Sequence, residues 1–428
     1  MRAGKCARCS SSDRDACSTF TFAATGIERS PAWAKPCKGR FVSLPVPAPV
    51  TDLDGFDREL RALKAEATAS VGPEDLAHLL KLERWGRACT FAGYATSWLV
   101  PNPLSMALIA TGAMSRWAII AHHVTHKGMD RVPGTPARLT STGFAKGARR
   151  WVDWFDWFIP EAWSYEHNVL HHAYTNEVVD PDLVEENLAP LRDAKLPRLL
   201  KVLVLLTSAA TWKVTYYAPN TLQVLQRKRR REGHGELTAR SDARGPERTI
   251  AAFDFTQKDG RELWVRSLLP YAVLRFVLLP ALAWPLGAFA AISVWLNSLG
   301  AELLANLYTF FIITPNHAGE DLERFDGPPA QSREWFLRQV RSSVNYRTGG
   351  DVNDFLHGFL NYQIEHHLFP ELPPRQYQVL QPKVKALCEK HGVPYRQASV
   401  FARVRQLVGI AIGEKRMARP PTVTAPAV

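Results

Sequence analysis

Apolar residues along this chain gather into a few long runs instead of alternating with polar residues. Between Ala88 and Ala121 the only charged residue is Arg116, and the segment Pro101 to Pro103 interrupts the run near its middle. A helix that crosses a membrane needs about 20 predominantly apolar residues. The run therefore predicts two membrane helices joined by a tight turn, of which the first is short for a full crossing.

Two further apolar runs, Leu268 to Leu286 and Ala288 to Ile313, are separated by a single glycine. They predict a second hairpin of membrane helices. Arg275, Glu302 and Asn306 lie within these runs, and polar side chains are costly where they face lipid. We expect these three side chains to face the interior of the helix bundle.

The segment Leu199 to Leu222 is apolar in its middle but carries Lys201 and Lys213, which leaves a charge-free run of eleven residues. Such a run is too short to cross the hydrocarbon core, so we predict an interfacial segment. Four tryptophans between residues 151 and 163 either form an interfacial belt or belong to the core.

The remaining pattern divides the chain into four parts. Residues 1–50 lack sustained periodicity and predict a disordered arm. Residues 51–86 show helical spacing of leucines and predict amphipathic helices that lie against the membrane or the catalytic domain. Residues 87–400 hold the membrane catalytic domain, and residues 401–428 hold the end of a helix and a disordered, Pro-rich tail.

The net charge of +12 comes from basic residues that border the apolar runs, notably Arg227 to Arg231 in a predicted loop. This placement favours a membrane surface over nucleic acid as the partner, and by the positive-inside rule it marks the cytoplasmic side. The six cysteines form no disulfide framework, and the pair Cys6 and Cys9 lacks a second pair at zinc-finger spacing. A reducing, cytoplasm-facing location is consistent with this composition.

Eight of the thirteen histidines lie in three short stretches: HHVTH at 122–126, HNVLHH at 167–172 and QIEHH at 363–367. Residues three and four apart share a face of a helix, so each stretch can direct two or three side chains at one point. Converging neutral imidazoles without cysteine suit a transition metal such as iron, zinc or copper. A single HxxxH pair is commonly just solvated, but three stretches offer more ligands than one tetrahedral zinc requires. A two-metal site is the favoured hypothesis.

Other residues near these stretches extend the candidate site. His317 follows the second predicted hairpin as His122 follows the first, and we expect it to be a further ligand. Asp180 and Asp182 follow the second stretch, where they either hold metal-bound imidazoles through the second ring nitrogen or cap a turn at Pro181.

Membrane topology provides an independent check. All histidine stretches must meet on one side of the membrane, so the number of crossings between His172 and His317 must be even. With Leu199 to Leu222 interfacial, the second hairpin alone lies between them, and the ligands can meet. Iron suits such a site better than zinc, because oxygen activation on lipidic substrates fits a membrane surface better than hydrolysis does.

The stretches HHVTH, HNVLHH and NYQIEHHLFP, with TN and DPDL after the second, resemble the integral-membrane fatty-acid desaturase family. The branch that the chain resembles most has glutamine at the first position of the third stretch, as in front-end acyl desaturases. The resemblance covers roughly residues 85–400. It implies an all-α integral membrane fold of four transmembrane helices in two hairpins, with a cytosolic helical cap that holds a diiron site.

The resemblance also implies which residues bind the metals. The implied ligands are His122, His126, His167, His171, His172, His317, His366 and His367. Gln363 takes the first position of the third stretch, where it binds iron weakly, acts through water, or only orients its neighbours. His123 and His357 match no ligand position, and we expect them to be structural or to support the ligands.

The implied activity is dioxygen-dependent introduction of a double bond into the acyl chain of an acyl-lipid or acyl-CoA. No HPGG-type haem-binding motif is present, so we expect the two electrons to come from a separate ferredoxin or a free cytochrome with its reductase. A diiron lipid hydroxylase or other monooxygenase is the alternative. A membrane metal-binding or transport protein is disfavoured, because the histidines cluster at predicted helix exits and not at helix centres.

Overall fold

The computed structural model describes residues 52–233, 250–328 and 330–420. Within these residues the fold is entirely helical, with three isolated β-bridges and no strand. The expected all-α class is therefore confirmed for the described part of the chain. The predicted arm, residues 1–50, and the last residues of the predicted tail, 421–428, lie outside the described residues.

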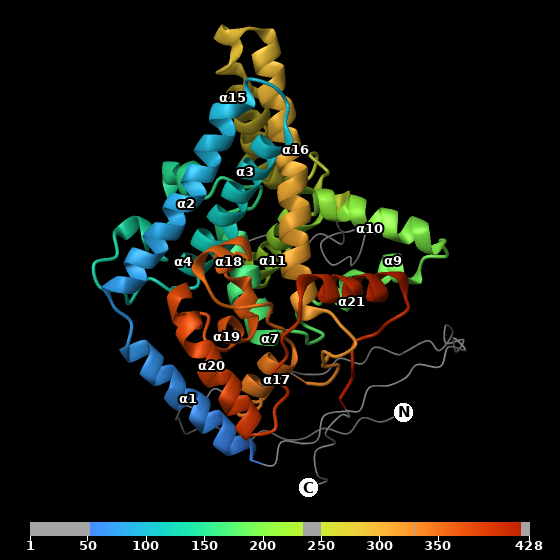
Figure 1. The fold of residues 1–428 in the computed structure, drawn as a ribbon. Helices are drawn as coiled ribbons and strands as arrows, with labels where there is room; N and C mark the ends of the chain where they lie inside the picture. Colours follow the sequence, from blue (N-terminus) through green and yellow to red (C-terminus); the bar gives the residue numbers. More distant parts are fainter. Residues whose placement is uncertain (1–51, 234–249, 329, 421–428) are drawn as a thin grey trace, which may run out of the picture. The chain divides into compact units, whose positions relative to one another are not determined.

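Three long helices open the fold (Figure 1). They are α1 (Leu53–Ala69), α2 (Pro73–Ser97) and α3 (Pro103–Met114), and α3 continues through η1 (Ser115–Ala121) into α4 (His122–Thr125). Asn102 begins α3 by accepting a hydrogen bond from the Ser105 amide at 2.8 Å, and Pro103 occupies the first helical position. Helix α2 passes through residue 87 without a break, so one helix joins the region 51–86 to the region that follows.

Short helices connect this part to the next long ones. They are η2 (Ala137–Leu139), η3 (Gly147–Arg149), α5 (Arg150–Asp153), α6 (Pro160–Trp163), η4 (Ser164–His171), α7 (His172–Tyr174), α8 (Val184–Asn187) and α9 (Ala189–Asp193). The long helical stretches that follow are α10 (Arg198–Trp212), η5 (Lys213–Tyr217) and α11 (Ala218–Arg231), then α13 (Lys258–Leu263), η7 (Trp264–Leu268), α14 (Leu269–Val273), η8 (Leu274–Leu278), α15 (Leu279–Ala281) and η9 (Trp284–Leu286), then α16 (Ala288–Ile313) and η10 (Thr314–His317).

The carboxyl-terminal part returns to short and medium helices. They are α17 (Trp335–Arg341), α18 (Asp351–Leu356), η11 (Leu360–Tyr362), α19 (Gln363–Leu368), α20 (Pro374–Lys390) and α21 (Val400–Ile412). The third histidine stretch thus lies on its own helix, because Gly358 and Phe359 adopt positive φ angles of 66° and 57°. These left-handed residues separate α18 from α19 and redirect the chain.

Five segments of the described chain are π-helical, and three of them precede a proline. The segments η5, η7 and η8 end two residues before Pro219, Pro270 and Pro280. Proline lacks an amide hydrogen and crowds the preceding turn, which a wider turn relieves. The other two, η1 and η4, have no proline two residues after their ends; η1 leads directly into His122, and η4 itself contains His167 and His171. We infer that the wide turns of η1 and η4 help to place those histidines.

Among the described residues, four helices are long and apolar enough to cross a membrane. They are Pro103–Thr125, Arg198–Arg231, Lys258–Leu286 and Ala288–His317, and α2, which holds the first helix predicted in the run from Ala88 to Ala121, is not among them. The prediction that Leu199 to Leu222 is too short for a crossing is wrong on length. Lys213 does not interrupt its helix, because its ammonium group is buried in an ion pair with Asp156. The basic run at 227–231, predicted as a loop, forms the last turn of α11.

Helices α2, α3 and α16 pack side by side (Figure 1). The contact between α2 and α3 is close, because a Cβ atom at Gly112 would lie 2.1 Å from the Thr90 hydroxyl oxygen. Asn297 of α16 fixes the turn between these two helices. Its amide nitrogen donates to the Ser97 carbonyl at 2.9 Å, and its amide oxygen accepts from the Asn102 amide at 2.9 Å. The turn is therefore held at a defined height along α16.

The polar groups expected to face the bundle interior do so. Arg275, Glu302 and Asn306 are 2%, 7% and 1% exposed. The Glu302 carboxylate accepts hydrogen bonds of 2.7 Å from the Trp157 indole and the Tyr271 hydroxyl, and it lies 3.3 Å from the Arg275 guanidinium. The Asn306 side-chain amide donates a further hydrogen bond of 3.1 Å to the same carboxylate, so the buried carboxylate is the shared partner of three donors and one cation.

We expect Glu302→Ala to lower the free energy of unfolding by about 3–5 kcal/mol, because it leaves the Arg275 charge buried without its partner. The measurement is the unfolding midpoint in detergent. Leu303→Ala is the matched control, because Leu303 is the next residue of α16 and is 40% exposed. Equal unfolding midpoints for the two variants would show that the ion pair contributes nothing.

Candidate metal centre

The nine residues predicted as ligands come from four separated parts of the chain, and all nine are buried. The wide turn η1 ends at α4, which carries His122, and His126 follows it; η4 and α7 carry the second stretch. His317 ends η10, directly after the long helix α16, and α19 carries Gln363 and the last histidine pair. The structure therefore brings three distant stretches and His317 together.

The ring nitrogens of eight histidines form two groups, in each of which the nitrogens lie within 4.8 Å of one another. The five-histidine group consists of His122, His126, His167, His172 and His366. The three-histidine group consists of His171, His317 and His367. These groups are adjacent, because the rings of His172 and His367, one from each group, stack with centroids 4.2 Å apart.

Consecutive histidines serve different groups. His171 belongs to the three-histidine group and His172 to the five-histidine group, and the pair His366 and His367 divides in the same way. Neighbouring side chains on a helix point about 100° apart, so an HH pair cannot direct both rings at a single point without strain. The two HH pairs therefore indicate two centres and not one.

Hydrogen bonds on the outer side of the rings determine which nitrogen faces inward. The Nδ1 atom of His317 lies 3.0 Å from the Ser342 carbonyl oxygen, and Nδ1 of His366 lies 3.2 Å from the Tyr377 hydroxyl. Nδ1 of His367 lies 3.0 Å from the Thr175 hydroxyl. Partners of this kind hold the proton on Nδ1 and leave the Nε2 lone pair free for a metal.

Asp180 performs both roles that the sequence left open. Its carboxylate lies 3.1 Å from Nδ1 of His171, and it also accepts hydrogen bonds of 2.9 Å from the amides of Asn176 and Asp182. It thus orients an imidazole and caps the turn at Pro181. Burial alone would lower the pKa of His171, but the Asp180 carboxylate more than offsets it and raises the pKa.

Asp182 does not contact a histidine ring through a hydrogen bond. Its carboxylate accepts from the Tyr217 hydroxyl at 3.1 Å, beside the fully buried Glu166. Burial raises the pKa of Asp182 to about 6, and burial together with Asp182 raises the pKa of Glu166 well above its usual value. Glu166, Asp182 and His167 form a third group of possible ligand atoms. The sequence analysis missed Glu166, although it directly precedes His167.

The chemistry of the two histidine groups fits metal ions. Nε2 of His122 lies 2.9 Å from Nε2 of His366 and 3.1 Å from Nε2 of His167, so lone pairs face one another. Both ring nitrogens of His172 and Nε2 of His126 are buried without a partner. Burial and neighbouring imidazoles lower the pKa of His126, His167, His172, His366 and His367, which makes these rings neutral. A cation in each group satisfies nitrogens that the protein leaves unpaired.

The two histidines without an implied ligand position lie outside both groups. Nδ1 of His123 lies 2.7 Å from the Ile119 carbonyl oxygen, and its ring stacks on His122 with centroids 5.2 Å apart. His357 is half-buried, and its Nδ1 lies 2.8 Å from the Asn353 carbonyl oxygen. His123 thus supports a neighbouring ring, and His357 ends a helix away from the site.

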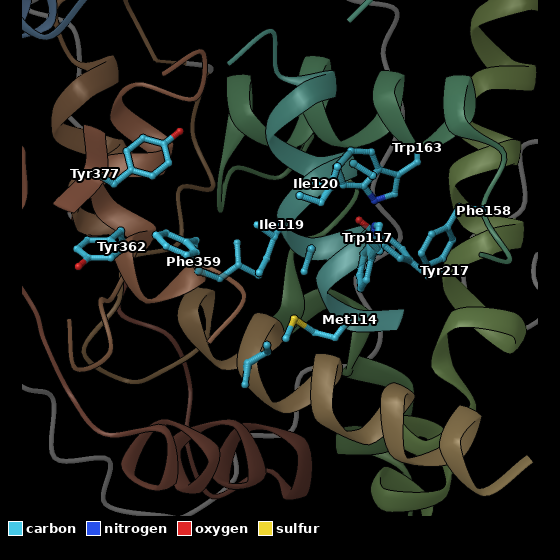
Figure 2. Packing of buried hydrophobic residues seen from close by; sticks show 14 of the residues in the cluster. Met114, Trp117, Ile119, Ile120, Phe158, Trp163, Tyr217, Phe359, Tyr362 and Tyr377 are labelled. Carbon is cyan, nitrogen blue, oxygen red and sulfur yellow. The ribbon is translucent and has the colours of Figure 1, made fainter. Parts of the chain in front are cut away.

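An aromatic wall covers one side of the five-histidine group, and Figure 2 shows four of its side chains, Trp163, Trp117, Phe158 and Tyr217, near one another. The Trp163 ring stacks on His167 with centroids 4.4 Å apart at 22°, and Trp117 contacts Trp163, Phe158 and Tyr217. The sequence left open whether the tryptophans of this region form an interfacial belt or belong to the core. Three of them are buried and belong to the core: Trp154, Trp157 and Trp163. This wall excludes water from the rings that it covers.

Comparison with known proteins identifies the family of the chain. A family model described as fatty acid desaturase matches residues 96–399. The chain belongs to the fatty acid desaturase family. The match begins near the end of α2 and ends just before α21, so it includes all four segments that carry the histidines.

Curated relatives of this desaturase-family chain carry related names. The Delta(5) fatty acid desaturase A of Dictyostelium discoideum is 27% identical over 55% of this chain and 48% of its own length. The NADPH-dependent stearoyl-CoA 9-desaturase of Mycobacterium tuberculosis is 25% identical over 82% of this chain and 77% of its own length. The acyl-lipid 8-desaturase of Rebecca salina is 26% identical over 74% and 65%. The chain thus spans about half of the first relative and about three-quarters of the second.

We expect Asp180→Asn to weaken metal binding about 10- to 100-fold, because the amide holds the His171 ring less firmly than the carboxylate does. Metal retained per chain during titration with a chelator measures this change. Asp193→Asn is the matched control, because the Asp193 side chain is 61% exposed and pairs with Arg192. If the two variants release metal at the same chelator concentration, Asp180 has no role in binding.

Proposed function

We propose that this chain is a membrane fatty acid desaturase that introduces a double bond into an acyl chain with dioxygen and two electrons. The observation that carries the proposal is the division of eight buried histidines into two adjacent groups. Hydrolysis can proceed at a single metal with an open position, whereas two neighbouring redox metals suit the oxidation of an unactivated carbon. Family membership supports the same activity.

In this proposal the five-histidine group and the three-histidine group each hold one iron, with Gln363 beside the second. Two irons, when bound, would supply the electrons for dioxygen cleavage and the oxidising power to remove hydrogen from a methylene group. The protein's own contribution is to hold the rings through Asp180, Ser342 and Tyr377. The aromatic wall around Trp163 keeps water from the site.

The proposed placement in the membrane is two hairpins, one formed by α2 with α3 and η1, the other by residues 258–286 with α16. Asn297, which fixes the first turn, lies 20 residues before His317. At 1.5 Å per residue this is about 30 Å, the thickness of a hydrocarbon core. The turn and the histidines would then lie at opposite faces of the bilayer.

Residues 198–231 lie along the membrane surface in this proposal. The histidines form one cluster, so the number of crossings between His172 and His317 must be even, and the second hairpin already supplies two. Helix α10 exposes Leu199, Leu203 and Leu206 on one side, while Lys201 on the other side donates to the Arg192 carbonyl oxygen at 2.5 Å. An apolar exposed face of this kind suits an interfacial helix.

The cap of the proposal consists of α1 and α17 to α20, and it lies on the cytoplasmic side with the histidines. Basic residues at the end of α11 support this orientation, and Arg229 and Arg230 pair with Glu262 and Asp259 there. The catalytic domain is placed at residues 87–400, in agreement with the family match at 96–399. Residues 51–86 and 401–428 flank it.

The substrate class is an acyl-lipid or an acyl-CoA, since the relatives' names include both. The electrons are proposed to come from a separate donor, a ferredoxin or a free cytochrome with its reductase. The mycobacterial relative's name, which specifies dependence on NADPH, is consistent with such a chain of donors.

We expect His171→Ala to abolish the new unsaturated acyl chain, because it removes a ring from the three-histidine group. His357→Ala is the matched control and should retain the wild-type product, because His357 lies outside both groups. Mass spectrometry of lipids from cells expressing each variant is the measurement. If cells that express the wild-type protein contain a hydroxylated acyl chain without a new double bond, the monooxygenase alternative is favoured instead.

Membrane placement can be tested with single cysteines at Asn187 and Lys258, in a variant whose native cysteines are replaced by serine. If residues 198–231 lie along the surface, an impermeant maleimide labels both positions from the same side of sealed vesicles. Labelling from opposite sides would show that this segment crosses and would contradict the two-hairpin placement.

A further inference from the structure

Gln363 is the one predicted ligand that is not a histidine, and it is 3% exposed. Its amide nitrogen lies 2.7 Å from Nε2 of His317. Its amide oxygen accepts a hydrogen bond of 3.3 Å from the side-chain amide of Asn316. The oxygen, which is the only atom of this amide that can bind a metal well, therefore points away from the ring nitrogen of His317.

The surroundings of Asn316 determine this orientation. The Asn316 side chain is fully buried, and its amide nitrogen also donates to the Leu360 carbonyl oxygen at 3.0 Å. If Asn316 turned over, its oxygen would face that carbonyl oxygen. If Gln363 turned over alone, two amide nitrogens would face each other. Only the observed arrangement pairs each donor with an acceptor.

His317 has its proton on the opposite side of the ring. Nδ1 of His317 lies 3.0 Å from the Ser342 carbonyl oxygen. A carbonyl oxygen can only accept a hydrogen bond, so Nδ1 carries the proton and Nε2 carries a lone pair. A metal ion bound in the three-histidine group would take this lone pair. The amide hydrogen of Gln363 then requires another acceptor, and leaving it without one in a buried site is costly.

The two groups also differ in the number of rings. The five-histidine group can complete the coordination of an ion with imidazoles alone, whereas three rings leave positions for smaller ligands. We infer that Gln363 does not bind metal through its oxygen but donates a hydrogen bond to a water molecule or small anion in the three-histidine group. Asn316 is the positioning residue that directs this donor. This inference rests on the proposed diiron function.

The test measures iron per chain and the affinity for azide, which is an anionic acceptor, by absorption titration of the iron-loaded protein. Gln363→Leu should retain two irons, because all eight histidines remain, and should bind azide at least about tenfold more weakly, as expected for the loss of a hydrogen bond to a charged group. Gln363→Glu, which has the same shape, should also retain two irons and bind azide more weakly, because a carboxylate repels the anion.

Asn316→Asp tests the positioning role. An aspartate accepts from the Gln363 amide nitrogen, so the amide turns over, its oxygen faces the histidines, and azide binding weakens as in Gln363→Glu. Gln406→Leu is the matched control, because Gln406 lies on α21 and contacts Glu320 and Lys415. It should leave iron content and azide affinity unchanged.

The outcomes separate this inference from the proposed function. A fall to one iron per chain in Gln363→Leu would show that the amide is a ligand and would overturn the inference. Unchanged azide affinity in Gln363→Glu and Asn316→Asp would also overturn it while the diiron function stands. A wild-type protein that holds no iron would instead overturn the proposed function.

Discussion

The main physical constraint on this structure is that many imidazoles are buried together without forming hydrogen bonds to one another, which is costly. A buried polar group without a hydrogen bond destabilises a protein by about 1–3 kcal/mol, and the two histidine groups contain several such nitrogens. The surrounding fold prevents the rings from turning outward, because Asp180, Thr175, Ser342 and Tyr377 hold their outer nitrogens. The site is thus arranged for cations in advance, and the remaining helices serve to keep it closed and dry.

The same constraint relates the site to the membrane. Histidines from four parts of the chain can meet only if the helices between them return to the same side. This requirement supports the proposal that residues 198–231, a helix whose length and composition would permit a crossing, lie along the membrane surface. Buried charges inside the bundle have partners as well. Lys213 and Arg275 each lie beside a carboxylate.

Local patterns in the sequence predicted the parts of this arrangement that depend on neighbouring residues. The three histidine stretches and the position of His317 are visible because ligands recur at helical spacing and at helix ends. The division between two groups is not visible, since it depends on how consecutive rings of HH pairs turn in space. The supporting partners are also hidden, because Ser342 and Gln339 reach histidines that lie 25 and 28 residues away in sequence, from other segments of the chain. The sequence did not predict that residues 198–231 form one long apolar helix. Lys213 has the character of a surface charge in the sequence, and only the structure shows that Asp156 lies beside it.

The division of each HH pair between the two groups has a consequence for how the protein acquires its metals. His171 with His172, and His366 with His367, are rigidly connected through one peptide bond each. An ion bound in one group would therefore also restrain the backbone that presents rings to the other. A second ion would then meet ligands held more firmly than the protein's hydrogen bonds alone hold them, so loading should be cooperative, with few chains holding a single ion.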